Sequence, residues 1–192
     1  MLELSQKNLE MIDSLVSFGV FDDIDGYRID RRNGVILVCC ADGDQFHDLY
    51  QHECRFQLSQ RHDPRVHPLS HNGGPLAYDK DTPINRFSDS YKEYLFEIGD
   101  SVDMKDMPTI VVEGHGPCGA ARRHNISLIR QLEIQMRVKA TIRQMYPQVD
   151  VASHFHVDYK GWNGKEKKTY HLGREQWAEW FSIRSTPFLA LA

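Results

Sequence analysis

The chain has 192 residues, enough to bury the core of one domain. It carries 23 basic and 27 acidic residues, and the resulting net charge of −4 argues against nucleic acid or an anionic membrane as a partner. No apolar stretch approaches the roughly 20 residues of a membrane span, and the N-terminal residues lack the features of a secretory signal. We therefore expect a cytoplasmic protein whose four cysteines are thiols or metal ligands.

The first predicted element is an amphipathic helix within residues 1–20. Its apolar side chains share one helical face: Leu9, Ile12, Leu15 and Val16. Gly19 can end this helix. The continuous apolar run 34–40 then predicts a strand that is buried on both faces, which favours a parallel sheet. A helical pattern follows this strand, and residues 65–70 predict a short strand.

The middle of the chain continues the alternation of helices and strands. Ser90 and Glu93 form a capping box, which is typical of a helix N-terminus, and Gly99 can end that helix. The apolar run 107–112 then predicts a second buried strand.

The C-terminal part of the chain completes the pattern. A long helix is expected from Gly119 to Tyr146, where Pro147 stops it. Residues 149–159 alternate as in a strand, and residues 173–183 predict a final helix. Because helices and strands alternate along the chain, we predict an α/β fold with a mostly parallel core sheet flanked by helices.

Potential metal ligands follow both buried strands. Cys40 and Asp42 come at the end of the first, and His115 and Cys118 follow the second. Sites in open parallel sheets collect at the carboxyl ends of the strands, so Cys40, His115 and Cys118 can converge if the two strands are neighbours. Two thiolates and one imidazole suit Zn²⁺, with the fourth position left for water, substrate or Asp42. The alternative is a buried thiol and an unrelated turn.

The residues around His115 fit such a site. Gly114, Gly116 and Gly119 would let the backbone turn sharply around an ion. Cys118 would lie at the N-terminus of the long helix, where the helix dipole favours a thiolate.

Two further histidines have two possible interpretations. His154 and His156 alternate on one face of a predicted strand, so they could bind a second metal ion or could be strand residues with satisfied hydrogen bonds. Cys39 is expected to point to the opposite face of its strand from Cys40 and to fill the core.

The segments "VILVCCADGD", "HNGGP" and "TIVVEGHGPCGAA" together resemble the motifs of the β-class carbonic anhydrases in order and spacing, over residues 34–165. The resemblance implies one β-carbonic-anhydrase-like domain over residues 1–192. Its parts would be an N-terminal helical arm at 1–20, a core at 34–165, and a C-terminal helix and tail at 173–192. Such arms lie across a neighbouring subunit in the family, which implies a homodimer or a larger homo-oligomer.

The resemblance also implies a reaction and its residues. The zinc ligands would be Cys40, His115 and Cys118, and zinc-bound hydroxide would hydrate CO₂ reversibly, as in a zinc lyase. Asp42 would orient the attacking water or accept its proton. The "HNGGP" turn would contribute Gly73 and Gly74 to binding of the small-molecule substrate, CO₂ or bicarbonate.

One departure from the family pattern leaves the activity open. The family has an arginine two residues after the aspartate, where this chain has Asp44. Without that arginine, Asp42 could move onto the zinc, which would relieve carboxylate repulsion and close the site. The alternative function is therefore a non-catalytic protein, or a hydrolase of another small substrate, with a Cys₂-His-Asp zinc site. Several arginines could replace the missing one: Arg55, Arg61, Arg65, Arg122 and Arg123.

Overall fold

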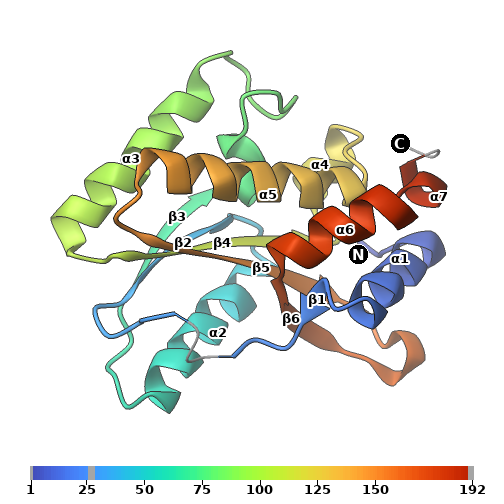
Figure 1. Ribbon diagram of the computed structural model, residues 1–192, viewed down its shortest axis with the longest axis horizontal. Coiled ribbons are helices and arrows are strands. Elements are labelled where there is room, and N and C mark those ends of the chain that lie inside the picture. Colours follow the sequence, from blue (N-terminus) through green and yellow to red (C-terminus); the bar gives the residue numbers. More distant parts are fainter. Residues whose placement is uncertain (1, 26–28, 190–192) are drawn as a thin grey trace.

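The described residues, 2–25 and 29–189, form a six-stranded sheet that helices cover on both faces, as the computed structural model shows (Figure 1). The strand order is β1-β6-β5-β4-β2-β3. The strands have the bounds β1 Phe21–Asp22, β2 Val35–Cys40, β3 Val66–His71, β4 Thr109–Gly116, β5 Asp150–Asp158 and β6 Lys167–Leu172. Strands β3, β2, β4 and β5 pair in parallel, whereas β6 pairs antiparallel with both β5 and β1. The prediction of a mostly parallel α/β fold is confirmed.

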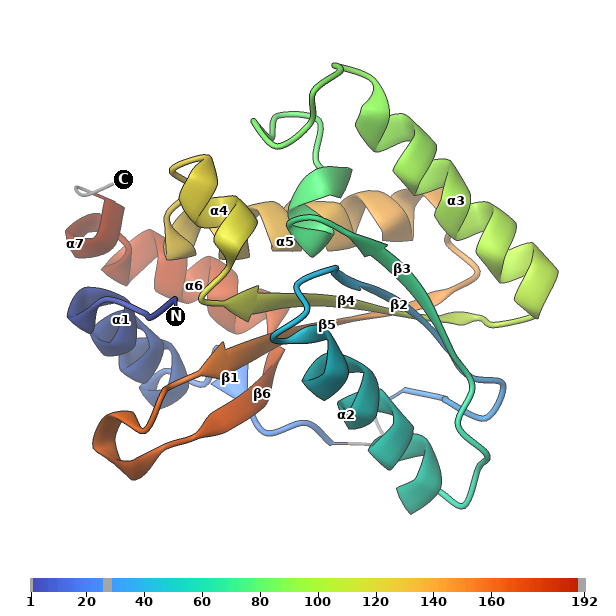
Figure 2. The same ribbon diagram turned by 180° about the vertical axis from the view of Figure 1, so that it is seen from behind.

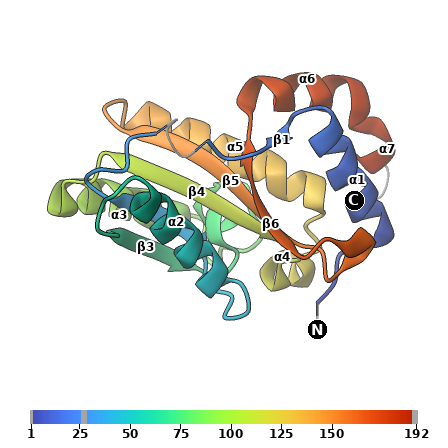
Figure 3. The same cartoon turned by 90° about the horizontal axis from the view of Figure 1, so that it is seen from below.

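The helices lie in three places around the sheet. Helices α3 and α5 cover one face and α2 covers the other (Figure 2), while α1 and α6 lie together near β1 and β6 (Figure 3). The helices have the bounds α1 Gln6–Ser17, α2 Phe46–Ser59, α3 Ser90–Lys105, α4 Gly119–Arg123, α5 Leu128–Met145, α6 Arg174–Arg184 and α7 Thr186–Leu189, with 3₁₀ turns η1 Gly74–Tyr78 and η2 Trp162–Gly164. None of these helices is both long and apolar enough to cross a membrane.

Strand β2 lies in the middle of two hydrophobic layers. Val35, Leu37 and Cys39 pack with Leu49 of α2 on one face, and Cys40 joins the core under α3 and α5 on the other. Successive side chains of a strand point to opposite faces, so an unbroken apolar run needs helices on both sides. The prediction that Cys39 and Cys40 face opposite sides is confirmed.

Helix α1 packs against its own chain. Ile12 and Leu15 are fully buried in a cluster that includes Phe155 of β5 and Trp180 of α6. The Trp180 Nε1 also donates a hydrogen bond to Ser14 Oγ at 3.0 Å. The expectation that this helix lacks a partner in its own chain is therefore wrong, whereas its contact with a neighbouring subunit stays a prediction. Its partners are residues far along the sequence, which local patterns do not bring together.

Helix α3 passes through Gly99 instead of ending there. The helix begins after Asp89, so Ser90 is not its N-cap, and no side chain caps it. A Cβ at Gly99 would lie 2.7 Å from the hydroxyl oxygen of Tyr146, which donates a hydrogen bond to the Leu95 carbonyl. The glycine therefore permits the close approach of a tyrosine and does not terminate the helix.

The long helix predicted after Gly119 is two helices, α4 and α5, with a sharp turn between them. Asn125 has a positive φ of 54°, and Ser127 is extended and forms the N-cap of α5. Asparagine tolerates the left-handed conformation, and serine favours the N-cap position. The turn lets α5 lie along the sheet while α4 stays at the end of β4.

Candidate metal centre

Three predicted ligands lie together where β2 and β4 end. Cys40 is the last residue of β2, His115 is next to last in β4, and Cys118 directly precedes α4. The two strands are parallel neighbours, so their carboxyl ends are adjacent. One potential ligand atom of each residue lies within 4.8 Å of the others, and all three side chains are buried. The structure thus brings the three residues together, and their role as ligands stays a prediction.

The turn containing Gly73 and Gly74 packs directly on Cys40. The Gly73 N–H donates a hydrogen bond to Cys40 Sγ at 3.2 Å. Both glycines have positive φ, of 88° and 55°, and a Cβ at Gly74 would lie 2.7 Å from the Cys40 backbone nitrogen. Glycine is required for both reasons. The two residues therefore form one wall of the site, and their contact with substrate stays a prediction.

Cys118 is placed to carry a negative charge. The Cys40 thiol beside it lowers the pKa of Cys118; burial opposes this, and hydrogen bonds from the backbone N–H groups of Ala121 and Ala120 lower it further, to about 7. The contact with Cys118 and burial raise the pKa of Cys40. The pair therefore loses its first proton from Cys118, and a bound cation would favour ionisation of both thiols.

The chemistry of this donor set fits zinc. His115 is 2% exposed, and neither of its ring nitrogens has a hydrogen-bond partner. Buried polar atoms are nearly always paired, so an unpaired buried imidazole indicates a missing partner. Two cysteine sulfurs and one imidazole nitrogen are the ligands that tetrahedral Zn²⁺ prefers.

The nearby glycines have a different role from the predicted one. Gly114 and Gly116 lie within β4 and Gly119 begins α4, so none of them turns the backbone around an ion. A Cβ at Gly114 would collide with Gln135 Oε1, and one at Gly116 would lie 3.3 Å from the Phe155 ring. Gly114 and Gly116 therefore allow close packing over the sheet face, which a motif of local sequence does not indicate.

Asp42 lies beside the three-residue cluster. Its Oδ1 accepts the backbone N–H of Asp44 at 3.0 Å, and its charge acts to raise the pKa of Cys118. Across residues 2–25 and 29–189, no arginine or lysine forms an ion pair with Asp42. Asp44 is exposed, and Gln45 is the N-cap of α2. Ligation of zinc by Asp42 stays a prediction.

Two cavities reach the cluster. The smaller has a volume of about 10 Å³, room for about one water molecule, and lies beside His115 and Cys118. Gln135 lines it, and the buried Oε1 of that residue has no hydrogen-bond partner. The larger has a volume of about 340 Å³, and its lining residues include Cys118 and Arg122. Five arginines are candidate replacements for the arginine that the family motif has at position 44. Of these, Arg122 lines the same cavity as the predicted zinc ligand Cys118.

The other candidate arginines lie elsewhere. Arg123 lines a cavity of about 430 Å³ together with Asn72. Arg55 is exposed on α2, and Arg65 donates to the Asn33 and Lys105 carbonyl oxygens. Neither of these positions is next to Asp42.

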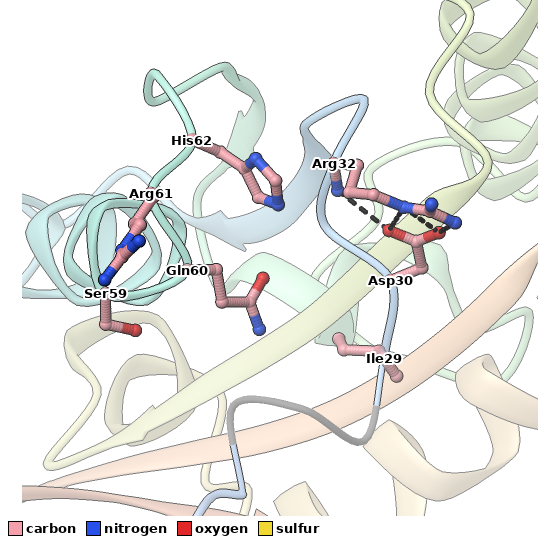
Figure 4. Close-up of a pocket in the computed structure, with 7 residues that line it drawn as sticks. All are labelled: Ile29, Asp30, Arg32, Ser59, Gln60, Arg61 and His62. Atoms are coloured by element: carbon pink, nitrogen blue, oxygen red, sulfur yellow. Dashed lines mark hydrogen bonds and ion pairs between the residues drawn. The ribbon is translucent and has the colours of Figure 1, made fainter.

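A cavity of about 590 Å³ lies at the amino-terminal ends of β2 and β3, away from the cluster (Figure 4). Its lining residues are Ile29, Asp30, Arg32, Ser59, Gln60, Arg61 and His62. Arg32 pairs with Asp30 there, and its hydrogen bond lowers the pKa of Asp30 to about 2. Arg61 is therefore separated from Asp42 by the length of β2.

Sequence reasoning missed a second buried cluster. His52, Glu53, Glu113 and His154 each place one potential ligand atom within 4.8 Å of the others. Burial acts to raise the pKa of Glu53, but His154 and Arg31 hold it at about 2. Burial and the Glu53 charge hold the pKa of Glu113 well above its usual range. Only His154 was identified from the sequence, because nothing local indicates that a helical Glu53 is fully buried.

Comparison with known proteins gives distant structural similarities. No protein-family model and no curated protein matches this sequence. A β-carbonic anhydrase of Aspergillus fumigatus is 13% identical, with a TM-score of 0.44 over 80% of this chain and 99% of that chain. A carbonic anhydrase of Streptococcus mutans is 13% identical, with a TM-score of 0.42 over 90% and 100%. The periplasmic domain of a Salmonella ser. Paratyphi A lipopolysaccharide acetyltransferase is 12% identical, with a TM-score of 0.39 over 96% and 76%. At TM-scores below 0.5, none of these similarities assigns a family to this chain.

Proposed function

We propose that this protein is a zinc enzyme that reversibly hydrates CO₂, as the β-class carbonic anhydrases do. The observation that supports the proposal is the buried cluster of Cys40, His115 and Cys118, which would supply three of the four ligands of a tetrahedral zinc ion. Zn²⁺ bound there would act as a Lewis acid and lower the pKa of water, which is the chemistry that CO₂ hydration needs.

The residues around the ligands would fix their charge and orientation. The Gly73 N–H stabilises the Cys40 thiolate, as the backbone at the start of α4 stabilises that of Cys118. The Asp44 N–H holds Oδ1 of Asp42, which leaves Oδ2 to accept a proton from the attacking water. These contacts support the proposed role of Asp42 as a proton acceptor beside the cluster.

The space beside His115 has room for about one water molecule and not for a larger group. The adjoining cavity has a volume of about 10 Å³, and Phe155 and Gln135 are among its lining residues. The Phe155 ring is an apolar wall of this cavity, and the unpartnered Gln135 Oε1 can accept a hydrogen bond from a water molecule there. CO₂ and bicarbonate would have to approach from the cavity of about 340 Å³ at Cys118.

A cytoplasmic location and a homodimer or larger homo-oligomer stay predictions. Large apolar side chains exposed at or before α3 support self-association: Phe87, Phe96 and Met104.

CO₂ hydration by the zinc-loaded protein is expected to be zinc-dependent and to rise from about pH 7 to about pH 9. The two thiolate ligands donate charge to the metal, so water ionises less readily there than beside three neutral histidines. Stopped-flow measurement with a pH indicator tests this, with chelator-treated protein as the control. A rate no higher than that of buffer across this range would contradict the proposed activity.

A closed Cys₂-His-Asp zinc site without catalysis is the second candidate. It is favoured by one observation, which is that Asp42 lies beside Cys118 without an ion-pair partner in the described parts of the chain. In that case Asp42 would occupy the fourth position and exclude water.

Asp44→Arg is expected to raise CO₂ hydration by about tenfold, equivalent to about 1.4 kcal/mol, because the new guanidinium can pair with Asp42 and hold it away from the metal. Asp44→Asn is the matched control, since it removes the charge without adding a cation. A rate in Asp44→Arg where the unmodified protein has none would favour the closed site as the native state. An unchanged rate would show that the missing arginine does not limit activity.

A further inference from the structure

We propose that His52, Glu53, Glu113 and His154 form a second metal site, distinct from the cysteine cluster, that binds a divalent first-row transition metal ion. Helix α2 contributes His52 and Glu53, β4 contributes Glu113 and β5 contributes His154. Glu113 and His154 are register partners on neighbouring strands, two residues after Val111 and Ala152, which pack with Leu49 on the sheet face that α2 covers. The four ligands therefore come from three different elements.

The polar atoms of this cluster face one another at short distances, and the contact of Glu53 with His154 is an ion pair only when the histidine is protonated. Glu53 Oε1 lies 3.2 Å from His154 Nδ1 and 3.9 Å from His52 Nδ1. These three atoms and both carboxylate oxygens of Glu113 are buried without hydrogen-bond partners. Glu53, Glu113 and His154 are at most 1% exposed. Unpaired buried polar atoms are costly, and a cation among them would satisfy the whole group.

A further positive group would also fit the charges of this cluster. Arg31 Nε pairs with Glu53 Oε2 at 3.0 Å, which leaves Oε1 of that residue directed at the two histidines. Arg31 offsets the Glu53 carboxylate, whereas in the described parts of the chain no arginine or lysine forms an ion pair with Glu113, and burial together with the Glu53 charge raises the pKa of Glu113. A divalent ion would neutralise the second carboxylate, and the Arg31 contact would orient Glu53 as outer-shell partners of metal ligands do.

The donor set selects the class of metal. Two imidazole nitrogens and two carboxylate oxygens suit Mn²⁺, Fe²⁺, Co²⁺ or Zn²⁺, whereas Ca²⁺ and Mg²⁺ prefer oxygen alone. The side chain of His52 is 23% exposed, so a metal ion would reach the cluster from solvent past this residue. His156 is not a ligand, since its Nδ1 bonds to Thr169 Oγ1 at 2.8 Å and it lies outside the cluster. The residues that could share a metal ion with His154 are therefore on α2 and β4, and His156 is not among them.

Mn²⁺ binding tests this site separately, because Mn²⁺ favours nitrogen and oxygen ligands over thiolates. After removal of metal, the unmodified protein and Cys118→Ser are each expected to bind one Mn²⁺ per chain, measured by equilibrium dialysis and elemental analysis. Glu113→Gln, which keeps the side-chain shape, is expected to bind Mn²⁺ at least tenfold more weakly. Glu179→Gln, at an exposed position of α6, is the matched control and should bind like the unmodified protein.

Equal Mn²⁺ binding by Glu113→Gln and the unmodified protein would overturn the proposal. Absence of Mn²⁺ binding would do so as well, and would assign the cluster to a buried water or a shared proton. If Glu113→Gln does not fold, His52→Asn at the half-exposed ligand gives the same test. Thermal unfolding adds a second readout, since Mn²⁺ should raise the Tm of Cys118→Ser and leave that of Cys118→Ser/Glu113→Gln unchanged. Because Cys118→Ser lacks the cysteine cluster, this result does not depend on the proposed CO₂ chemistry.

Discussion

Cys118→Ser is expected to lose zinc from the cluster of Cys40, His115 and Cys118 and to reduce CO₂ hydration to the rate of buffer. Serine is similar in size, but its hydroxyl does not ionise near neutral pH and is a poor zinc ligand. Outer-shell partners alone control about 10- to 100-fold in metal affinity, so loss of a direct ligand should cost more than about 100-fold. Competition with a chelator measures the affinity, and stopped-flow hydration measures the rate.

Cys54→Ser is the matched control for this experiment. Cys54 is also a buried free thiol, but it lies on α2 and is not part of the cluster. Co²⁺ gives a site-specific readout, because thiolate ligands produce a charge-transfer absorption that nitrogen and oxygen ligands do not. The absorption should persist in Cys54→Ser and weaken in Cys118→Ser. An unchanged zinc affinity in Cys118→Ser would remove that residue from the ligand set, and an unchanged rate would separate catalysis from the cluster.

The cysteine cluster was predictable because its signals are local. Cys40 ends a run of apolar residues that can only be a buried strand, and His115 and Cys118 follow another such run. Only one non-local assumption is needed to bring the three residues together, namely that the two strands are parallel neighbours. Strands β2 and β4 are paired in this way. The fold class followed from the same alternation of buried strands and helices.

The cluster of His52, Glu53, Glu113 and His154 was not predictable because it depends on which face of α2 packs against the sheet. Glutamate on a helix is normally exposed, and the sequence around Glu53 does not indicate which helical face meets the sheet. The burial of Glu53 follows from its contacts with Arg31 and His154, which lie 22 residues before and 101 residues after it in sequence. Gly99 was misjudged for a similar reason, since its role depends on the distant Tyr146.

Arg31→Met in metal-free protein is expected to lower the free energy of unfolding by about 3–5 kcal/mol. Arg31 and Glu53 are both fully buried, with Arg31 Nε 3.0 Å from Glu53 Oε2. Methionine can keep the apolar contact with the Phe56 ring, but it leaves the Glu53 carboxylate without its arginine. Urea unfolding measures the change. Arg32→Met is the matched control at the next position, because its pair with Asp30 is exposed to solvent and should contribute little to stability.

The pH dependence of this difference separates a charge effect from a packing effect. In the folded protein the pKa of Glu53 is about 2, against 4.5 for the free side chain, because His154 and Arg31 outweigh the effect of burial. A lowered carboxyl pKa gives stability that is fully present above pH 4.5 and is lost as the pH falls toward 2. The difference between the unmodified protein and Arg31→Met should therefore be largest above pH 4.5 and shrink in acid. A difference that stays constant over this range would assign the effect to packing of the arginine side chain and not to its charge.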